Sequence, residues 1–385
     1  MTKDDFIVFG QPLIEQAEID EVTKVLKAAW LGTGPRCHEF EEKFANYKNV
    51  EFSTALNSCT AGLHLSCLVL GLKPGDEVIT SAMTFCATVN AIIHSGATPV
   101  LADIDPDTWN LNPEEVEKKI SKKTKAIIPV HFAGRSCEMD KLVELAKNEN
   151  IKIIEDCAHA IESTYKGKPV GTFGDVGVFS FYATKNIVTG EGGMAISSDE
   201  LIINKIRKLA LHGLSTDAWA RFSDKGYNHY LVEDAGFKCN MMDLQAAIGL
   251  HQLDKIEQLW KKRKKIWSIY DEAFINLPIT LPAPWEKGNR HGHHLYTILI
   301  DEKKTGIVRD EFMQAMYEKG IGTGVHYLSI PEHHYYQKKY GWHPEDYPKA
   351  MRVGRQTVSL PLSAKLEEND VGRIIHAVCE IFQDD

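Results

Sequence analysis

The chain has 385 residues, of which 43% are hydrophobic and 25% charged, and its formal net charge is −9 at pH 7. That composition excludes a disordered protein, and the negative charge argues against a general affinity for nucleic acid or anionic membranes. A single hydrophobic core stops growing near ~250–300 residues, so the length favours two domains.

Cysteine usage and the N-terminus indicate the compartment. The eight cysteines form no C-x-x-C pair, and the adjacent His333 and His334 lack further ligands at suitable spacing, so we expect reduced thiols and no metal. The opening "MTKDDFIVFG" lacks the apolar stretch of a signal peptide, and no apolar run approaches the ~20 residues that span a bilayer. The cytoplasm is the expected location.

The first 200 residues predict helices alternating with strands. Apolar positions recur at helical spacing over residues 15–31, and "LGTGP" then ends the pattern. Over residues 50–197, helical stretches such as "EMDKLVELAKNEN" separate strand-like runs: "DEVITSA", "TPVLADI", "KAIIPVHF", "IKIIEDCA", "VGVFSF" and "GMAISS". This alternation is typical of a mostly parallel sheet covered by helices, which collects ligands at the carboxyl ends of its strands.

The remaining sequence predicts a smaller unit. A long helical pattern covers residues 241–274 and ends before "NLPITLPAPWEKG", a loop with three prolines. Strand-like "HHLYTILID" and helical "VRDEFMQAMYEKG" and "KLEENDVGRIIHAVCEIF" follow. We therefore expect an α/β protein: a large three-layer α/β/α domain over residues 1–250, and a smaller C-terminal α/β domain over residues 251–385 reached through a long connecting helix.

An acid and an amine follow two of the predicted strands. Asp156 ends "IKIIED", and Lys185 follows "VGVFSF" across a short loop. A buried carboxylate can keep a ring nitrogen protonated, and a desolvated lysine can attack a carbonyl. Together these are the requirements of pyridoxal phosphate chemistry, although structural Asp and Lys residues at loop ends are common.

A third segment adds a phosphate site. "LNSCTAGLHL" runs from a strand-like segment through Ser58 and Thr60 into a helix, where free N–H groups and the helix dipole favour a phosphate. Ser180 adds a hydroxyl from the strand before Lys185. Simple N-capping explains Ser58 and Thr60 equally well. Phe85 in "MTFCATVNA" is suited to stacking on a cofactor ring, with an ordinary core phenylalanine as the alternative.

These blocks resemble a known family. "WLGTGP", "TAGLHL", "TFCATVNAI", "PVHFAG", "IIEDCAHA", "YKGKPVGTFGDVGVFSF", "KNIVTGEGGM", "GFKCNMMDLQAAIGLHQL" and "SLPL" stand in order over almost the whole chain. In this the sequence resembles the DegT/DnrJ/EryC1/StrS sugar aminotransferases, pyridoxal phosphate enzymes of the aspartate aminotransferase fold, type I. The resemblance implies that fold and that cofactor, with pyridoxamine phosphate as the intermediate form.

The resemblance also implies roles for individual residues. Lys185 would bond to the cofactor aldehyde and then act as acid and base in the proton shift. Asp156 would pair with the ring nitrogen. His159 would lie near the cofactor's phenolic oxygen, with a packed core histidine as the alternative. The other implied contacts hold the ring face or the phosphate: Phe85 on the ring, and Thr60, Ala61 and Ser180 at the phosphate.

The block "GFKCNMMD" departs from the family's usual "YNYRM"-type string, whose polar residue reaches the phosphate of the neighbouring subunit. Lys238 or Asn240 would make that contact here, and we favour Asn240. It resembles the "GYKYN" variant of enzymes acting on UDP-linked 4-keto sugars, and the loop over residues 211–222 resembles that branch too. Such contacts imply a homodimer with shared active sites.

The resemblance further implies that the amino group of L-glutamate passes to a keto sugar, with 2-oxoglutarate released. A nucleotide-linked 4-keto sugar is favoured, for surface polysaccharide, lipopolysaccharide or a secondary metabolite. Expected sugar contacts lie in three loops: Thr33, His212, and His326 with Tyr327. The nucleotide, the keto position and the nucleotide linkage itself stay open.

Two rival functions share the fold. A related dehydratase branch has histidine in place of the lysine, and Lys185 argues against it. A catalytically silent regulatory homologue is the other, and the presence of Lys185, Asp156 and the phosphate loop together argues against that. A nucleotide-binding module lacks support, because neither G-x-G-x-x-G nor G-x-x-x-x-G-K-[ST] occurs.

Overall fold

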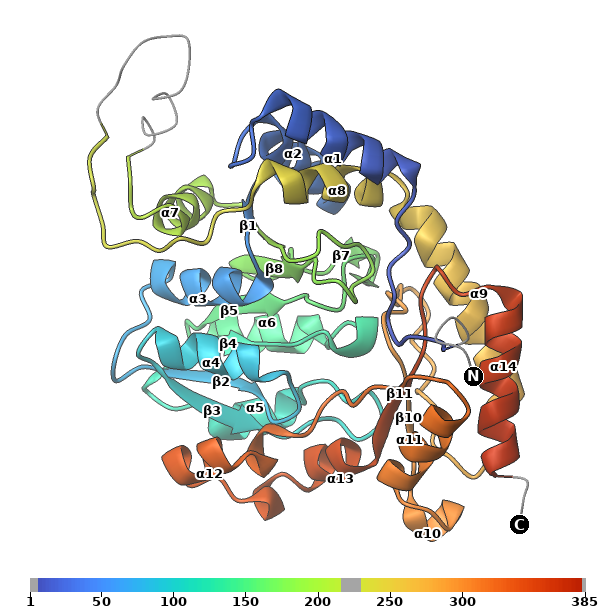
Figure 1. Ribbon diagram of the computed structural model, residues 1–385. Coiled ribbons are helices and arrows are strands. Elements are labelled where there is room, and N and C mark those ends of the chain that lie inside the picture. The colour runs from blue at the N-terminus through green and yellow to red at the C-terminus, as the bar shows by residue number, and fades with distance from the viewer. Residues whose placement is uncertain (1–5, 216–229, 383–385) are drawn as a thin grey trace.

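A computed structural model describes residues 6–215 and 230–382 (Figure 1). Within them, a seven-stranded sheet has the order β1-β9-β8-β5-β4-β2-β3. β9 runs antiparallel to both neighbours and the other pairs are parallel, which confirms the predicted mostly parallel sheet. Its strands are β1 (Phe52–Leu56), β2 (Glu77–Ser81), β3 (Thr98–Ala102), β4 (Thr124–Ile128), β5 (Lys152–Asp156), β8 (Val176–Ser180) and β9 (Gly193–Ser197).

Helices cover both faces of this sheet. In β4, Ala126 and Ile128 pack against the core under α3, α4 and α7, whereas Ile127 packs on the opposite face against α5 and α6. α2 and α8 cover that opposite face over β8 and β9. Because both faces are buried, the strands read as nearly continuous apolar runs. The covering helices are α2 (Pro35–Lys48), α3 (Cys59–Val69), α4 (Cys86–His94), α5 (Pro113–Lys119), α6 (Met139–Asn148), α7 (Glu200–Ala210) and α8 (Asp243–Asp254).

The C-terminal part has its own core around a two-stranded antiparallel sheet. Ile7 also belongs to this core and pairs with Ile321, so the start of the described chain packs against the C-terminal part (Figure 1). The elements outside the large sheet are α1 (Gln16–Ala28), β6 (Thr164–Tyr165), β7 (Lys168–Pro169), α9 (Ile256–Phe274), β10 (Tyr296–Leu299), α10 (Glu302–Thr305), α11 (Arg309–Glu318), α12 (His334–Tyr340), α13 (Pro348–Gln356), β11 (Thr357–Leu360) and α14 (Glu368–Ile381).

The single helix predicted over residues 241–274 is two helices, α8 and α9. They meet at Lys255, whose φ of −104° and ψ of 9° lie outside the helical values. The break lets the two helices pack in different cores: Leu253 packs with α2, whereas Trp267 packs in the C-terminal core. The division at residue 250 stays a prediction.

The start of α3 lies directly against β9. A Cβ atom on Gly193 would approach the Ser58 carbonyl carbon at 2.5 Å and the Cys59 nitrogen at 2.6 Å. Both atoms belong to the backbone and cannot rotate away, so only glycine allows α3 to begin this close to the sheet. None of the helices in the described residues is long and apolar enough to cross a membrane.

We expect Gly193→Ala to lower the free energy of unfolding by about 1–3 kcal/mol, because the added methyl group must displace backbone. Gly372→Ala is the matched control: it lies on α14, and an added Cβ would meet nothing within 4 Å. There the change should be neutral or stabilising by up to ~1 kcal/mol. Urea unfolding of the two variants measures the difference, and equal effects would contradict the packing argument.

Candidate active site

A cavity of about 370 Å³ lies at the carboxyl ends of β5 and β8. Its walls come from the first turn of α3, the start of α4, the loop between β8 and β9, and the pair His326 and Tyr327. Ligand sites of open α/β sheets lie at this edge, and the volume is in the range of small-molecule pockets.

Asp156 ends β5 and is 4% exposed at the wall of the cavity. Burial raises the pKa of its carboxyl group, and hydrogen bonds work against that rise. The Thr88 hydroxyl donates to Oδ2 at 2.8 Å, and the Ala158 N–H donates to Oδ1 at 3.1 Å. The Thr84 hydroxyl in turn donates to the Thr88 hydroxyl oxygen, with 2.8 Å between the two Oγ1 atoms, because the Thr88 proton is already donated to the Asp156 carboxylate.

Lys185 lines the same cavity from the loop after β8. Burial lowers the pKa of its amine to about 8, although the Cys59 thiol and Asp156 favour the charged form. At that pKa roughly a tenth of the amine is neutral at pH 7, against well under a thousandth for an ordinary lysine. The neutral amine is the form that attacks a carbonyl carbon.

The start of α3, where the sequence predicts a phosphate, borders the same cavity. Cys59 and Thr60 in the first turn of α3 line it, as does Ser180. Ser58 is the N-cap and accepts the Ala61 N–H at 3.1 Å, so that N–H is already engaged, and Ala61 does not line the cavity. The helix start therefore opens into the cavity through Thr60 and Cys59.

Phe85 stands at the start of α4 and lines the cavity with 54% of its surface exposed. Its ring centroid is 5.5 Å from that of Tyr327. A phenylalanine in a cavity with this much exposed surface offers a ring face to a planar ligand. Tyr182, 47% exposed, lines the cavity as well.

His159 is buried at the cavity wall, and burial holds its pKa well below the usual range. Its Nδ1 accepts the Ala133 N–H at 3.2 Å, so the ring proton is on Nε2, which donates to the Tyr327 oxygen at 2.8 Å. The Tyr327 hydroxyl is left to donate its own proton. His326 contacts the Ser359 hydroxyl through Nδ1 at 2.9 Å, and burial lowers its pKa to about 3.

Besides Ala61, four predicted residues lie outside the cavity lining: Thr33, His212, Lys238 and Asn240. The Asn240 side chain donates to the Thr33 hydroxyl at 2.6 Å, and its Oδ1 is buried without a hydrogen-bond partner in the described part of the chain. His212 is exposed, as is Lys238. The rest of the loop over residues 211–222, from residue 216 on, lies outside the described residues.

Sequence reasoning missed Thr88, Tyr182 and Glu191, which all line the cavity. A signal existed for Thr88: Thr84 and Thr88 stand four residues apart where a predicted strand leads into a helix, so both face the strand ends. Tyr182 and Glu191 carry no such spacing.

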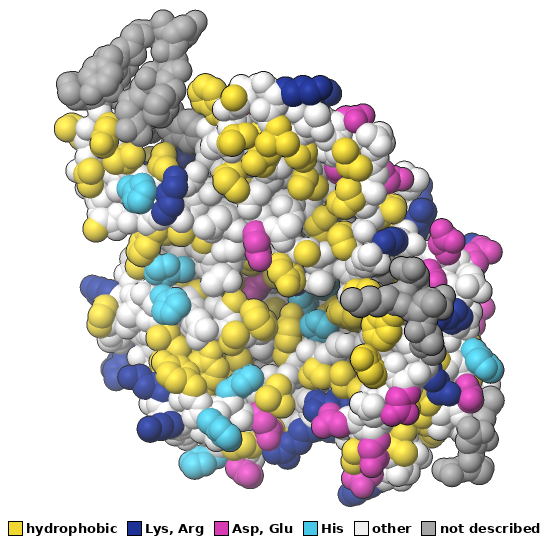
Figure 2. Space-filling view, in the orientation of Figure 1, with side chains coloured by type: hydrophobic (Ala, Val, Ile, Leu, Met, Phe, Trp, Pro, Cys, Tyr) yellow, Lys and Arg dark blue, Asp and Glu magenta, His cyan; other side chains and the backbone are white. Residues whose placement is uncertain are grey.

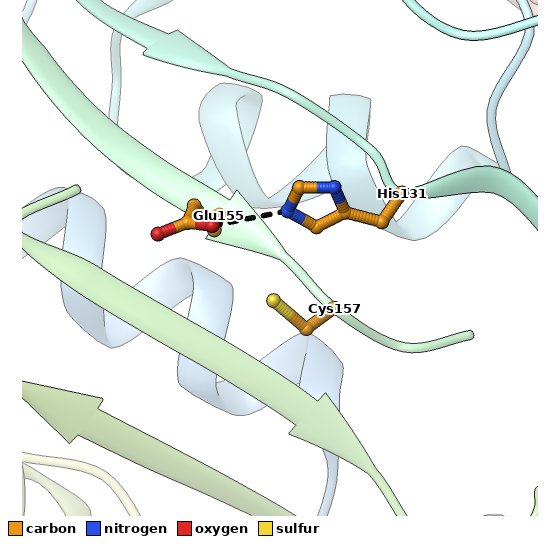
Figure 3. A group of neighbouring side chains, drawn as sticks. All are labelled: His131, Glu155 and Cys157. Atoms are coloured by element: carbon orange, nitrogen blue, oxygen red, sulfur yellow. Dashed lines mark hydrogen bonds and ion pairs between the residues drawn. The ribbon is translucent and has the colours of Figure 1, made fainter. Parts of the chain in front are cut away.

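One buried group has ligand types that metals use. Potential ligand atoms of His131, Glu155 and Cys157 lie within 4.8 Å of one another, and Figure 3 shows the ring directed at the carboxylate. His131 Nδ1 accepts the Cys137 N–H at 3.0 Å, so Nε2 carries the proton and donates to Glu155 at 3.1 Å. Both ring nitrogens are engaged. Glu155 also accepts three backbone N–H groups, those of Gly171, Phe173 and Gly174. Its acceptor positions are filled, and the group supports the end of β5 beside Asp156.

Comparison with known proteins agrees with this geometry. The sequence pattern of the DegT/DnrJ/EryC1/StrS aminotransferase family matches residues 12–379. The chain is 45% identical over 382 residues to the spore coat polysaccharide biosynthesis protein SpsC of Bacillus subtilis (strain 168), covering 99% of this chain and 98% of SpsC.

Two solved structures are similar over nearly their whole length as well. Spr1654 from Streptococcus pneumoniae in its PMP-form has a TM-score of 0.91 and 35% identity, over 98% of this chain and 99% of that one. A PLP-form of Spr1654 has also been solved. PseC from Helicobacter pylori, an aminotransferase involved in the biosynthesis of pseudoaminic acid, has a TM-score of 0.91 and 30% identity, over 99% and 100% of the two chains.

In the cofactor-free protein we expect acylation of Lys185 by acetic anhydride to reach half its maximal rate near pH 8, the pKa to which burial lowers the amine. Lys141 is the internal control, because it is exposed and Glu138 raises its pKa. Quantitative mass spectrometry of the two peptides across pH measures both midpoints. A Lys185 midpoint as high as that of Lys141 would refute the burial effect.

Thr88→Val removes the hydroxyl that donates to Asp156 and should raise the carboxyl pKa further. A carboxyl group whose pKa is higher in the folded than in the unfolded state costs no stability at a pH below the unfolded-state pKa, and it lowers the free energy of unfolding as the pH rises above that pKa. The loss of unfolding free energy caused by Thr88→Val should therefore grow from pH 4 to pH 7. Thr80→Val is the control, because that buried hydroxyl donates to the neutral Ile128 carbonyl at 2.8 Å. The loss of unfolding free energy in Thr80→Val should not vary with pH. A loss that is independent of pH in both variants would contradict the prediction.

Proposed function

The chain belongs to the DegT/DnrJ/EryC1/StrS aminotransferase family, and from that membership we propose that it transfers the amino group of L-glutamate to a nucleotide-linked 4-keto sugar. Membership confirms the resemblance, the fold type I expectation and the aminotransferase activity predicted from the sequence. The cofactor of this family, pyridoxal phosphate, is confirmed as well. The observation that carries the proposal is that Lys185 and Asp156 line one cavity.

The residues of the cavity fit pyridoxal phosphate. Asp156 has a raised pKa because its carboxylate is buried, and a protonated ring nitrogen would relieve that cost. The exposed face of Phe85 matches a planar ring. Thr60 and Ser180 bring hydroxyl groups to the end where the first turn of α3 favours a dianion. When bound, the cofactor supplies an electron sink for the carbon that loses a proton.

The chain's own residues supply the rest of the chemistry. Lys185, as a neutral amine, would hold the cofactor at its aldehyde carbon, and once the amino donor has taken its place its Nζ would take up a proton and return it. Asp156 would keep the ring nitrogen charged. His159 fixes the Tyr327 oxygen, so the Tyr327 hydroxyl proton is directed away from that ring.

The proposed acceptor rests on the relatives. SpsC is a spore coat polysaccharide biosynthesis protein, and PseC belongs to the biosynthesis of pseudoaminic acid, so an amino sugar is the common product class. We extend this to amino-sugar synthesis for surface polysaccharide, lipopolysaccharide or a secondary metabolite. Thr33, His212, His326 and Tyr327 are the proposed sugar contacts, and of these His326 and Tyr327 line the cavity.

A second copy of the chain completes the proposed enzyme. Hydrophobic side chains gather on the face over α1, α2 and α8 (Figure 2). Trp30, Leu31 and Met242 are 42–44% exposed there. An apolar surface of this kind supports a homodimer, in which Asn240 or Lys238 would contact the phosphate in the neighbouring subunit. All eight cysteines are free thiols, which supports the cytoplasm as the compartment.

We expect Lys185→Ala to lower amino transfer by at least ~10³-fold, because the nucleophile and the proton carrier are lost together. Borohydride reduction of the holoenzyme should fix the cofactor on the peptide that contains Lys185. Lys48 is the matched control: burial lowers its pKa to about 8 as well, but its Nζ donates to the Ile161 carbonyl at 3.0 Å and it does not line the cavity. Label on Lys48, or full activity without Lys185, would overturn the assignment.

The sugar is tested separately. The enzyme is converted to its amino form with L-glutamate, and 4-keto sugars linked to UDP, dTDP or GDP are added in turn. The acceptor is the sugar that restores the starting absorbance and yields an amino sugar. Turnover only with unlinked sugars, or only with 3-keto sugars, would refute the proposed acceptor while leaving the aminotransferase intact.

A further inference from the structure

The residue that follows Lys185 is tied into the protein by its side chain. Asn186 Nδ2 donates to Glu162 Oε2 at 2.6 Å and to the Gly292 carbonyl at 2.9 Å. Asn186 Oδ1 contacts His294 Nδ1 at 2.8 Å. All three partners lie outside the loop between β8 and β9, so these hydrogen bonds anchor the loop to other parts of the protein.

The chemistry of the partners decides where the protons are. A carboxylate and a carbonyl accept only, so the Asn186 amide must direct its NH₂ group at Glu162 and Gly292. Its oxygen then accepts from His294, whose Nδ1 must carry the proton. Burial holds the pKa of His294 well below the usual range, so the ring is neutral and its Nε2 carries none.

Glu162 is itself held by α9. Arg263 donates to Glu162 Oε1 through Nη2, and the two side chains are 3% and 0% exposed. Arg263 Nε also donates to the His293 carbonyl at 3.1 Å. A buried carboxylate with two donors on opposite oxygens has little freedom to move, and removing either donor leaves charge uncompensated.

The same network reaches other residues of the cavity wall. The His294 ring lies 4.4 Å from the His159 ring, centroid to centroid. His159 in turn donates to Tyr327. Through His294, Asn186 thus links the loop that carries Lys185 to the pair His159 and Tyr327, both of which line the cavity.

We propose that Asn186, clamped by Glu162, Gly292 and His294, is the positioning residue that directs Lys185 into the cavity. Lys185 lies in a loop, and its own N–H donates to the Tyr182 carbonyl at 2.8 Å, a bond that stays within that loop. A loop residue needs further anchors to hold a nucleophile within bonding geometry, and a displacement near 1 Å costs about 10²-fold in rate. The inference rests on the proposed role of Lys185.

Asn186→Ala tests the clamp directly. The Lys185 amine should swing toward solvent, so the pH midpoint of its acylation in the cofactor-free protein should rise by more than ~1 unit toward that of an ordinary lysine. In the holoenzyme kcat should fall about 10²-fold with KM changed much less.

Asn110→Ala is the matched control. Asn110 is a buried asparagine whose side chain, like that of the half-buried Asn186, makes three hydrogen bonds: it donates to the carbonyls of Arg135 and Ser136 and accepts the Phe132 N–H. It does not line the cavity. It should lower the melting temperature without moving the Lys185 midpoint. An unchanged midpoint in Asn186→Ala, or an equal shift in Asn110→Ala, would overturn the proposal.

A charge-exchange pair keeps the test valid if the alanine variant does not fold. Asn186→Asp places a second carboxylate against Glu162, and Glu162→Gln places a second NH₂ group against Asn186. Each alone should therefore lower kcat. The double variant Glu162→Gln with Asn186→Asp restores a donor facing an acceptor between these two positions, and the carboxylate introduced by Asn186→Asp can still accept from His294, while the bond to the Gly292 carbonyl stays lost. We expect it to recover at least ~10-fold of the lost kcat, whereas additive losses would refute the clamp.

The two hypotheses fail in different ways. If Lys185→Ala keeps full activity, the proposed function fails and the clamp loses its purpose. If Lys185→Ala is inactive and the Asn186 variants retain both the wild-type midpoint and kcat, only the clamp fails.

Discussion

The chemistry of this protein depends on burying a carboxylate and an amine at one edge of a sheet. β5 and β8 are parallel neighbours, and their register places Asp156 beside Val178, two residues before Ser180 and seven before Lys185. Burial alone would drive both groups to their neutral forms, the carboxyl upward in pKa and the amine downward. For the amine this shift is useful, because the neutral form reacts. For the carboxylate it is a cost that Thr88 and Ala158 reduce.

Much of this arrangement could be predicted from the sequence. The runs "IKIIED" and "VGVFSF" are uninterrupted apolar segments with polar residues at their carboxyl ends, and parallel strands bring those ends together. The first turn of α3 follows from Ser58 and the apolar run after it. These inferences need only local patterns and a general rule about sheets. In the structure, Asp156, Lys185 and Thr60 line one cavity.

Other features had no local signal. His159 and Tyr327 are 168 residues apart, and Thr33 and Asn240 are 207 apart, so their pairing depends on tertiary structure alone. The break at Lys255 was missed because lysine favours helix and both halves carry a buried stripe. Lys48 shows that a lowered lysine pKa alone does not identify a residue of the site. It has the same lowered pKa as Lys185, but it lies on α2 and donates to a carbonyl outside the cavity.

The ion pair between Arg263 and Glu162 has a consequence for how the chain can be divided. Arg263 is on α9, beyond residue 250, while Glu162, Asn186 and Lys185 all precede that point. A fragment that stopped at the end of the seven-stranded sheet would still contain Thr60, Phe85, Asp156, Ser180 and Lys185. It would also leave a buried glutamate without its cation, next to the loop that bears the reactive amine. A piece of this protein that keeps this ion pair must therefore extend through α9, and one that also keeps His326 and Tyr327 in the cavity wall must extend beyond it.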